Sequence, residues 1–361
     1  MKRLALVQIG HGTVGGDVIR QVVAQRAQWQ EAFDLDVRIA AVAGRHGVVL
    51  IEDGGELSEG DLLNACERRG MSATGPALTE VVPAVGNADA VILMDASAGE
   101  SATDALVAAL DAGAGAVLSN KAPMALPLSD PRAVTLWDHA RSGERLKYEA
   151  TCGAGLPVIS TLQTLLNTGD DVIEITAAAS GTFGAIFSSV ARGVPFSIAV
   201  ADAKAAGYTE PDPRDDLSGL DVARKALILS RTMGRRVDLD EIEVESLVPE
   251  SLADVSIETF MAGLGISNAE IGAQAAKAIS ERASLKYVAT VTPDGDIAVG
   301  LRAVPLSTVL GALQGPENIF SFRTRRYDAY PTVVSGPGAG AAVTAAGMIG
   351  DALNLARDMV K

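Results

Sequence analysis

Cysteine and histidine are scarce in this sequence. Its 361 residues include two cysteines, Cys66 and Cys152, and three histidines that lie far apart in the chain. Two cysteines are too few for a disulfide framework, and scattered histidines without a cysteine cluster argue against a zinc site. Apolar runs are short as well, because none reaches the ~20 residues that a membrane-spanning helix requires. The composition therefore excludes disulfide-rich, zinc-dependent and membrane-spanning classes of protein.

Positive charge is the other deficit. Asp and Glu outnumber Lys and Arg by 45 to 30, which gives a net charge of −15 and argues against a nucleic-acid or anionic-membrane partner. With 48 % hydrophobic and 21 % charged residues, the chain has the composition of a soluble globular protein and enough length for two domains. It enters a strand-like run at Leu4 with no signal-peptide core, so we expect a cytoplasmic protein.

The N-terminal part of the chain alternates short apolar runs with helical patterns. Strands are expected at 4–9, 37–43, 90–94 and 116–118, and helices near 14–28, 58–69, 101–112 and 133–142. Such alternation is typical of a Rossmann-type α/β domain, in which a doubly wound parallel sheet has helices on both faces. We place this dinucleotide-binding domain at 1–150, and expect the C-terminal segment 336–361 to pack back on it as a helix.

The second half of the chain has a different texture. Strands are expected at 172–178, 242–247, 285–291, 297–304 and 319–324, and Pro293-Asp294-Gly295 is typical of a hairpin turn. We therefore expect a second, α+β domain at 151–335 for substrate binding and dimerisation.

A glycine-rich loop, Gly10-His11-Gly12-Thr13-Val14-Gly15-Gly16, follows the first strand and opens the first helix. Glycines there let the backbone approach a pyrophosphate, and the helix N-terminus supplies N–H donors. The expected contacts are Gly10, Gly12, Thr13, Val14 and Gly15, although the same pattern also suits a tight turn without a ligand.

The second strand ends at Ala43-Gly44-Arg45-His46. It lacks the acidic residue that usually holds the ribose of NAD, whereas Arg45 suits the 2′-phosphate of NADP. The sequence therefore favours NADP, with NAD as the alternative cofactor and a solvated loop arginine as the alternative role of Arg45.

The segment 208–231 is the most informative part of the chain. It places Glu210, Asp212, Asp215, Asp216 and Asp221 within twelve residues and follows them with Lys225. Asp221 and Lys225 are four apart, so on a helix they share one face. The simplest alternative is a capped surface helix with an ordinary ion pair. Five neighbouring carboxylates would repel one another, however, unless a cationic or hydrogen-bonding group lies among them.

This segment resembles the substrate-binding signature of homoserine dehydrogenases, and the resemblance extends to 10–16, 148–157 and 338–351. Because the chain stops at Lys361, it resembles the short form without a regulatory domain. The resemblance implies catalytic roles for Lys225 as proton donor, Lys121 at the junction of cofactor and substrate, and Asp221. It also implies substrate contacts at Glu210, Asp216, Gly181 and Thr182, and further cofactor contacts at Ser97, Lys121, Gly338 and Gly340. The sequence departs from the family pattern at Ala185, where a tyrosine is common.

The turn at 148–157 resembles the family's site for a monovalent cation, sodium or another. The implied ligands are the Glu149 carboxylate and the main-chain carbonyls of Cys152, Ala154 and Leu156. Hard cations prefer such oxygen ligands. The alternative is a tight turn between domains.

The resemblance implies reversible, NADP-dependent reduction of L-aspartate 4-semialdehyde to L-homoserine, a step of threonine and methionine biosynthesis. It also implies a homodimer that pairs the second domains, through residues after Val172. Two alternatives stay open: an aspartate-semialdehyde dehydrogenase with Cys152 as nucleophile, and a non-catalytic NADP-binding sensor.

Overall fold

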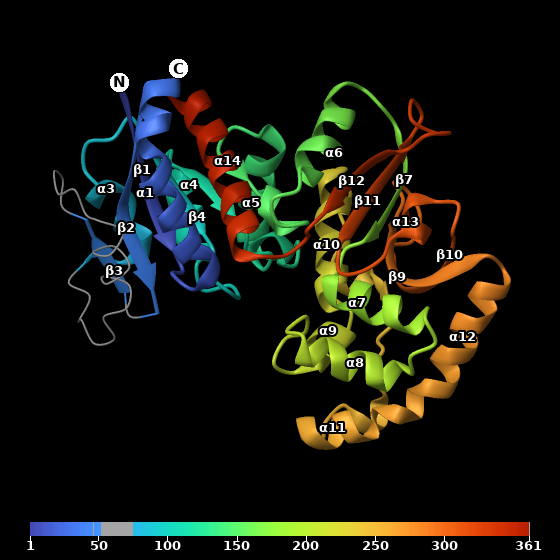
Figure 1. The fold of residues 1–361 in the computed structure, drawn as a ribbon. Coiled ribbons are helices and arrows are strands. Elements are labelled where there is room, and N and C mark those ends of the chain that lie inside the picture. The colour runs from blue at the N-terminus through green and yellow to red at the C-terminus, as the bar shows by residue number, and fades with distance from the viewer. Residues whose placement is uncertain (46, 52–74, 361) are drawn as a thin grey trace. The chain divides into compact units, whose positions relative to one another are not determined.

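The computed structural model describes residues 1–45, 47–51 and 75–360, and the chain forms two compact units (Figure 1). The first unit combines Met1–Pro157 with Ala339–Lys361, and the second is Val158–Gly338. The helix expected at 58–69, like His46 and Cys66, lies outside the described residues.

The first unit is built on a doubly wound sheet, as the sequence predicts. Its described strands are β1 (Lys2–Ile9), β2 (Leu35–Gly44), β3 (Gly47–Leu50), β4 (Ala90–Asp95), β5 (Gly115–Leu118) and β6 (Leu146–Lys147), in the order β3-β2-β1-β4-β5-β6. All neighbours are parallel except β3, which pairs antiparallel with β2. The sequence analysis did not anticipate β3. It forms because the chain reverses directly after Gly44 and continues from Gly47, whose φ of 118° suits a tight hairpin.

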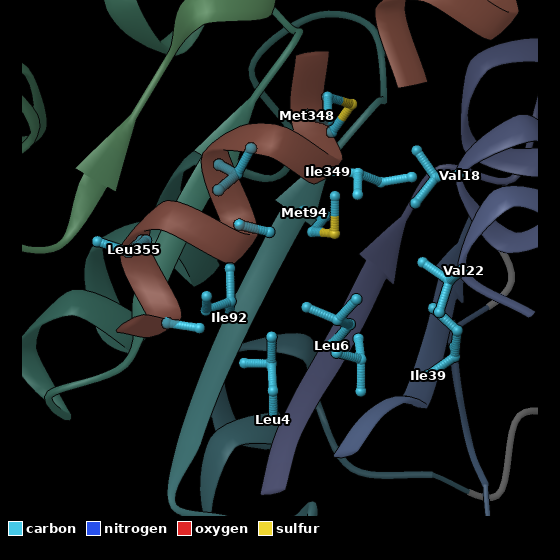
Figure 2. Packing of buried hydrophobic residues seen from close by; sticks show 14 of the residues in the cluster. Leu4, Leu6, Val18, Val22, Ile39, Ile92, Met94, Met348, Ile349 and Leu355 are labelled. Atoms are coloured by element: carbon cyan, nitrogen blue, oxygen red, sulfur yellow. The ribbon is translucent and has the colours of Figure 1, made fainter. Parts of the chain in front are cut away.

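The helices of the first unit include two that are far apart in the chain and adjacent in the fold. The described helices are α1 (Thr13–Phe33), α3 (Val81–Ala84), α4 (Thr103–Asp111), α5 (Pro131–Ser142) and α14 (Ala341–Met359), with 3₁₀ turns at Leu78–Glu80, Pro123–Ala125 and Glu149–Thr151. Helix α1 buries Val18 and Val22, four apart on one face. Helix α14 adds Met348, Ile349 and Leu355 to the same core, against β1 and β4 (Figure 2).

The second unit contains a mostly antiparallel sheet. Its described strands are β7 (Val172–Ala178), β8 (Glu243–Val244), β9 (Ala283–Val291), β10 (Ala298–Pro305), β11 (Asn318–Thr324) and β12 (Thr332–Gly336), in the order β12-β11-β7-β9-β10-β8. Strands β9 and β10 form the antiparallel pair expected around Pro293-Asp294-Gly295. The strand expected at 242–247 is shorter, because the backbone N–H of Leu247 already donates to the Leu217 carbonyl rather than to the sheet. Strand β12 was not predicted.

Helices of the second unit cover the sheet. They are α6 (Val158–Asn167), α7 (Gly181–Val190), α8 (Phe196–Ala205), α9 (Pro213–Leu217), α10 (Leu220–Thr232), α11 (Ile257–Gly263), α12 (Asn268–Ser280) and α13 (Val309–Ala312), with 3₁₀ turns at Leu239–Glu241, Glu250–Leu252 and Leu264–Ser267. Helices α7, α10 and α12 contact β9, and the Phe183 ring of α7 stacks on Tyr287 with 3.8 Å between centroids. In the part of the chain that the structure describes, no helix combines the length and apolar character needed to cross a membrane.

Candidate active site

The glycine-rich loop joins the buried strand β1 to the N-terminus of α1. Gly10 has a φ of 76°, and a Cβ there would lie 2.8 Å from the Ala96 carbonyl oxygen. A Cβ at Gly15 would lie 1.9 Å from the oxygen of Gly10. At Gly12, by contrast, a Cβ would meet nothing within 4 Å, and α1 has no side-chain cap there. Two glycines are therefore required by the turn itself, while Gly12 leaves the helix N-terminus accessible to an anion.

The buried Gln8 fixes this loop from within the sheet. Its Nε2 donates to the carbonyl oxygens of Ile9 (3.0 Å) and Gly10 (2.9 Å). The exposed Arg45 lies at the carboxyl end of the neighbouring strand β2. Gly44 beside it packs against the His11 ring, because a Cβ at Gly44 would lie 2.5 Å from the ring. Arg45 thus follows a strand end that contacts the glycine loop.

A buried carboxylate organises the ends of β4 and β5. Asp95 Oδ1 accepts hydrogen bonds from the Ser97 N–H (2.9 Å) and hydroxyl (2.6 Å), and Oδ2 accepts one from Asn120 Nδ2 (3.0 Å). Burial raises the pKa of Asp95, and these hydrogen bonds oppose the rise. Asp95 was not predicted as a site residue. It holds Ser97 and positions Asn120, the residue before Lys121, at the edge of the sheet where such folds bind ligands.

The turn implied to bind a cation contains two buried carboxylates. Glu149 is buried, and its N–H donates to Asp351 Oδ2 on α14 at 2.9 Å. Burial, and secondarily the charge of Glu149, raises the pKa of Asp351 to about 7. Cys152 is buried, and Ala154 has a left-handed backbone with a φ of 55°. Because Asp351 lies 202 residues from Glu149 in the chain, no local sequence pattern indicates that these two carboxylates lie side by side.

The acidic segment of the second unit divides into separate hydrogen-bonded groups. Asp212 caps α9 and pairs with Arg214 (Nη2–Oδ2 2.6 Å), which lowers the pKa of Asp212. Arg214 also donates to the carbonyl oxygens of Ala253 and Val255, so Asp212 has a structural role in this loop. Asp215 is exposed. The residues of this segment that are implied to act on a substrate are Glu210, Asp216, Asp221 and Lys225.

Lys225 is a buried cation of this segment. It extends from α10, where the i,i+4 spacing brings its Nζ to 2.8 Å from Asp221 Oδ2. Nζ also donates to the carbonyl oxygen of Ala179 at 2.6 Å. The Lys225 side chain is 9 % exposed and that of Asp221 is 45 % exposed. The ammonium is thus fixed at the carboxyl end of β7, and its carboxylate partner is open to solvent.

Thr182 connects the start of α7 to the acidic loop. Its hydroxyl oxygen lies 2.5 Å from the Tyr208 carbonyl oxygen and 2.8 Å from Asp216 Oδ1, while Asp216 Oδ2 accepts from the Glu210 N–H at 2.8 Å. Burial raises the pKa of Asp216, and the nearby charges of Asp221 and Asp215 add to this effect.

The predicted residues fall into one set per unit. The first unit holds the glycine loop, Arg45, Ser97, Lys121, the turn of Glu149, Cys152, Ala154 and Leu156, and Gly340 at the N-terminus of α14. The second unit holds Gly181, Thr182, Glu210, Asp216, Asp221, Lys225 and Gly338. In the second unit, Lys225, Asp221, Asp216 and Thr182 lie at the carboxyl end of β7 and in the loop beside it.

These features define a class: an α/β protein with a dinucleotide-binding type of fold and a second unit that presents a buried lysine beside several carboxylates. The family model described as "Homoserine dehydrogenase" matches residues 157–353. The chain is 33 % identical to the homoserine dehydrogenase of Schizosaccharomyces pombe, across 96 % of this chain and 94 % of that protein. The chain therefore belongs to the homoserine dehydrogenase family.

Two further similarities extend this result. The chain is 37 % identical to a chloroplastic bifunctional aspartokinase/homoserine dehydrogenase of Arabidopsis thaliana, over 98 % of this chain and 39 % of that protein. It thus spans less than half the length of such bifunctional relatives. A hyperthermophilic archaeal homoserine dehydrogenase, solved in complex with NADPH, has a TM-score of 0.72 at 22 % identity, over 98 % of each chain. This last similarity shows a shared fold.

Proposed function

We propose that this protein is a homoserine dehydrogenase that reversibly reduces L-aspartate 4-semialdehyde to L-homoserine with NADPH. The observation that carries the proposal is the buried Lys225 ammonium, held between Asp221 and the Ala179 carbonyl at the end of a strand. This arrangement lies within the part of the chain that matches the family.

The role of Lys225 follows from the charge that the reaction develops. A bound nicotinamide would supply a hydride, and negative charge would then develop on the carbonyl oxygen of the substrate. A nearby ammonium stabilises that oxygen and can give it a proton. Asp221 keeps Lys225 oriented, and the buried Ala179 carbonyl fixes the direction of Nζ.

The carboxylates select the amino-acid part of the substrate. Glu210, Asp216 and Asp221 present oxygen acceptors around one loop, which suits the substrate ammonium group. Burial raises the pKa of Asp216 in the free protein, and an arriving ammonium would favour its ionised form. Thr182 keeps Asp216 in place, and Gly181 belongs to the first turn of α7.

The first unit supplies the cofactor site in this proposal. The accessible N-terminus of α1 at Gly12 receives the pyrophosphate, with Thr13, Val14 and Gly15 in the first turn of the helix. Arg45 meets the 2′-phosphate, and Ser97, Lys121, Gly338 and Gly340 complete the contacts. The archaeal homoserine dehydrogenase solved with NADPH has the same fold and supports this choice. NAD remains the alternative cofactor.

The turn of Glu149 fits a monovalent cation in the chemistry of its donors. Glu149 and Asp351 are adjacent, and the charge of Glu149 disfavours the ionised form of the buried Asp351, so a bound cation would relieve that cost. Glu149 and the carbonyls of Cys152, Ala154 and Leu156 would hold sodium or a similar ion, and its role would be to stabilise this turn.

The alternatives receive less support from the site. As a nucleophile, Cys152 would need an accessible thiolate with an activating base. Its side chain is fully buried, and its sulfur lies 3.8 Å from the Thr151 hydroxyl oxygen. A silent sensor would have no use for a buried lysine that is paired with a carboxylate.

The proposal includes a homodimer formed through the sheet of the second unit. The register places Ala298, Thr290, Thr176, Ser321 and Val333 in one row across five strands, and all five are half-buried. A second copy across a two-fold axis would cover this row. Light scattering tests the idea, and a fully active monomer at micromolar concentration would refute it. The cytoplasmic location and the place in threonine and methionine biosynthesis remain predictions.

The decisive experiment is NADPH oxidation by the purified protein with L-aspartate 4-semialdehyde, followed by identification of L-homoserine as product. NADH is compared in parallel, and a reaction without semialdehyde serves as the control. We expect turnover with both substrates present and higher kcat/KM with NADPH. Absence of turnover by folded protein that binds NADPH would refute the proposed activity.

A further inference from the structure

Asn318, the first residue of β11, is a buried polar residue that the sequence analysis did not single out. The residue is 1 % exposed, and neither Nδ2 nor Oδ1 has a hydrogen-bond partner among the described residues. An amide has two donors and an acceptor, and buried groups of this kind are nearly always paired in folded proteins. An unpaired amide at this depth therefore points to a partner that is not part of the protein chain.

The register of the sheet places Asn318 at the candidate site. Ile319 pairs with Ala178 at the end of β7, so the same antiparallel register puts Asn318 opposite Ala179, whose carbonyl accepts from Lys225. Asn318 and Phe320 alternate with Ile319 and point to the other face of the sheet from it. Phe320 is fully buried, whereas Ile319 packs with the cluster around α13.

The neighbouring backbone fixes the amide and brings it toward α7. A Cβ at Gly338 would lie 1.8 Å from Asn318 Nδ2, so Gly338 leaves room for the amide and packs directly against it. The residues before Asn318 reach the start of α7, because a Cβ at Gly181 would lie 3.1 Å from the Pro316 carbonyl oxygen. The first N–H groups of α7, those of Gly181 and Thr182, have no acceptor within the helix.

The charge of the site indicates what this amide binds. Glu210, Asp216 and Asp221 supply acceptors for an ammonium group, but an α-amino acid also carries a carboxylate. That carboxylate needs donors, and an additional negative side chain would repel it. The amide of Asn318 and the N-terminus of α7 are uncharged donors at the same end of β7.

Resting on the proposed function, we propose that the Asn318 amide binds the amino-acid end of the substrate and donates from Nδ2 to its carboxylate. Gly338 then serves this amide by packing against it, in addition to any contact with the cofactor. Asn318 is a binding residue in this scheme, and Lys225 remains the proton donor.

The test uses the full chain saturated with NADP⁺ and measures the dissociation constant of L-homoserine by calorimetry. Asn318→Leu keeps the approximate shape and removes both polar groups, so homoserine binding should weaken by about 10- to 100-fold, the range for a hydrogen bond to a charged group. Asn318→Asp replaces the donor with a negative charge and should weaken it at least as much. The dissociation constant of NADPH should stay within about twofold in both variants.

Ser230→Ala is the matched control. Ser230 is fully buried on α10, and its hydroxyl has no partner among the described residues either, but it lies more than a helical turn beyond Lys225. Its removal should leave homoserine binding unchanged. If a folded Asn318 variant binds homoserine like the wild type, an ordered water satisfies the amide and the inference is wrong.

Weakened NADPH binding with unchanged homoserine binding would assign the amide to the cofactor and also overturn the inference. Wild-type protein that neither binds homoserine nor reduces the semialdehyde would instead refute the proposed function. The two failures are therefore distinguishable. If Asn318→Leu fails to fold, Asn318→Asp provides the same comparison.

Discussion

Two lysines of the second unit are buried to nearly the same extent and have very different surroundings. Lys225 on α10 is 7 % exposed and Lys286 on β9 is 5 % exposed. Lys225 forms an ion pair with Asp221 and donates a hydrogen bond to the Ala179 carbonyl. Lys286 donates to the Leu313 carbonyl, and burial lowers its pKa.

The difference shows that burial alone does not identify a catalytic lysine. A buried ammonium without a carboxylate loses hydration and tends toward its neutral form, which is a poorer proton donor to an oxyanion. A buried ammonium beside a partly exposed carboxylate, as at Lys225, lies close to a place where a ligand can arrive. The partner of a buried group, more than its depth, therefore indicates its function.

The strongest test of this comparison is Lys225→Ala beside Lys286→Met. Removal of the proton donor should lower kcat by about 10²–10⁴, the range for general acid catalysis, while Lys286→Met should leave kcat unchanged. The dissociation constant of NADPH, measured by fluorescence, should be unaffected in both. Near-normal turnover by Lys225→Ala would remove this lysine from the mechanism.

Asp351 extends the comparison to a buried acid. Its pKa in the folded protein, about 7, lies above the ordinary 3.8, so the folded state holds the proton more tightly. Stability is therefore lost as the pH rises from about 4 to about 7. Asp351→Asn removes this dependence, and relative to wild type it should gain up to about 4 kcal/mol at pH 8, from 1.4 kcal/mol per pKa unit.

Thermal melting at several pH values measures the effect of Asp351→Asn. The buffer should contain tetramethylammonium in place of sodium, because a small cation beside Glu149 would lower the pKa of Asp351. Asp111→Asn, at an exposed carboxylate on α4, is the control. A variant whose melting temperature follows that of the wild type at every pH would show that folding does not raise the pKa of Asp351.

Arg45 is an exposed cation, in contrast to the two buried lysines. Arg45→Ala should weaken NADPH binding by about 1–3 kcal/mol, as for a hydrogen bond to a charged group, and should leave NADH binding unchanged. Dissociation constants of both cofactors measure this selectivity. A wild type that prefers NADH, or an equal loss for both cofactors, would contradict the assignment.

Cys152→Ser should have the smallest effect. The thiol is buried, and the proposed role belongs to the main-chain carbonyl, which serine retains. We expect kcat within about twofold of wild type, a barrier change below about 0.5 kcal/mol. Loss of activity with an unchanged melting temperature would instead support a mechanism in which the thiol is the nucleophile.

The parts of the fold that could be predicted are those with local signals. The glycine loop, the alternation of strands and helices in the first unit and the i,i+4 pair of Asp221 and Lys225 each depend on residues close in the chain. Strand β12 was missed, because its half-buried residues alternate weakly and it is held mainly by pairing with β11.

The parts of the site that could not be predicted depend on distant residues. Asp351 lies beside Glu149 only because α14 returns to the first unit, and Asn318 reaches the end of β7 only through the sheet register. The sequence analysis treated the carboxylates of the acidic segment as one group. In the structure, Asp212 instead pairs with Arg214 and stabilises the loop. This separate role of Asp212 depends on the contacts of Arg214 with the carbonyl oxygens of Ala253 and Val255, which no local sequence pattern indicates.

The return of α14 has a consequence for the order of events during synthesis. The first unit obtains Met348, Ile349 and Leu355 of its core from the last part of the chain, after the whole second unit has been translated. At about 5–20 residues per second, that interval lasts roughly ten to forty seconds. During it, the apolar side chains on β1 and β4 that later meet α14 lack their cover. The nascent protein thus exposes part of the core of its first unit until the last helix has been synthesised.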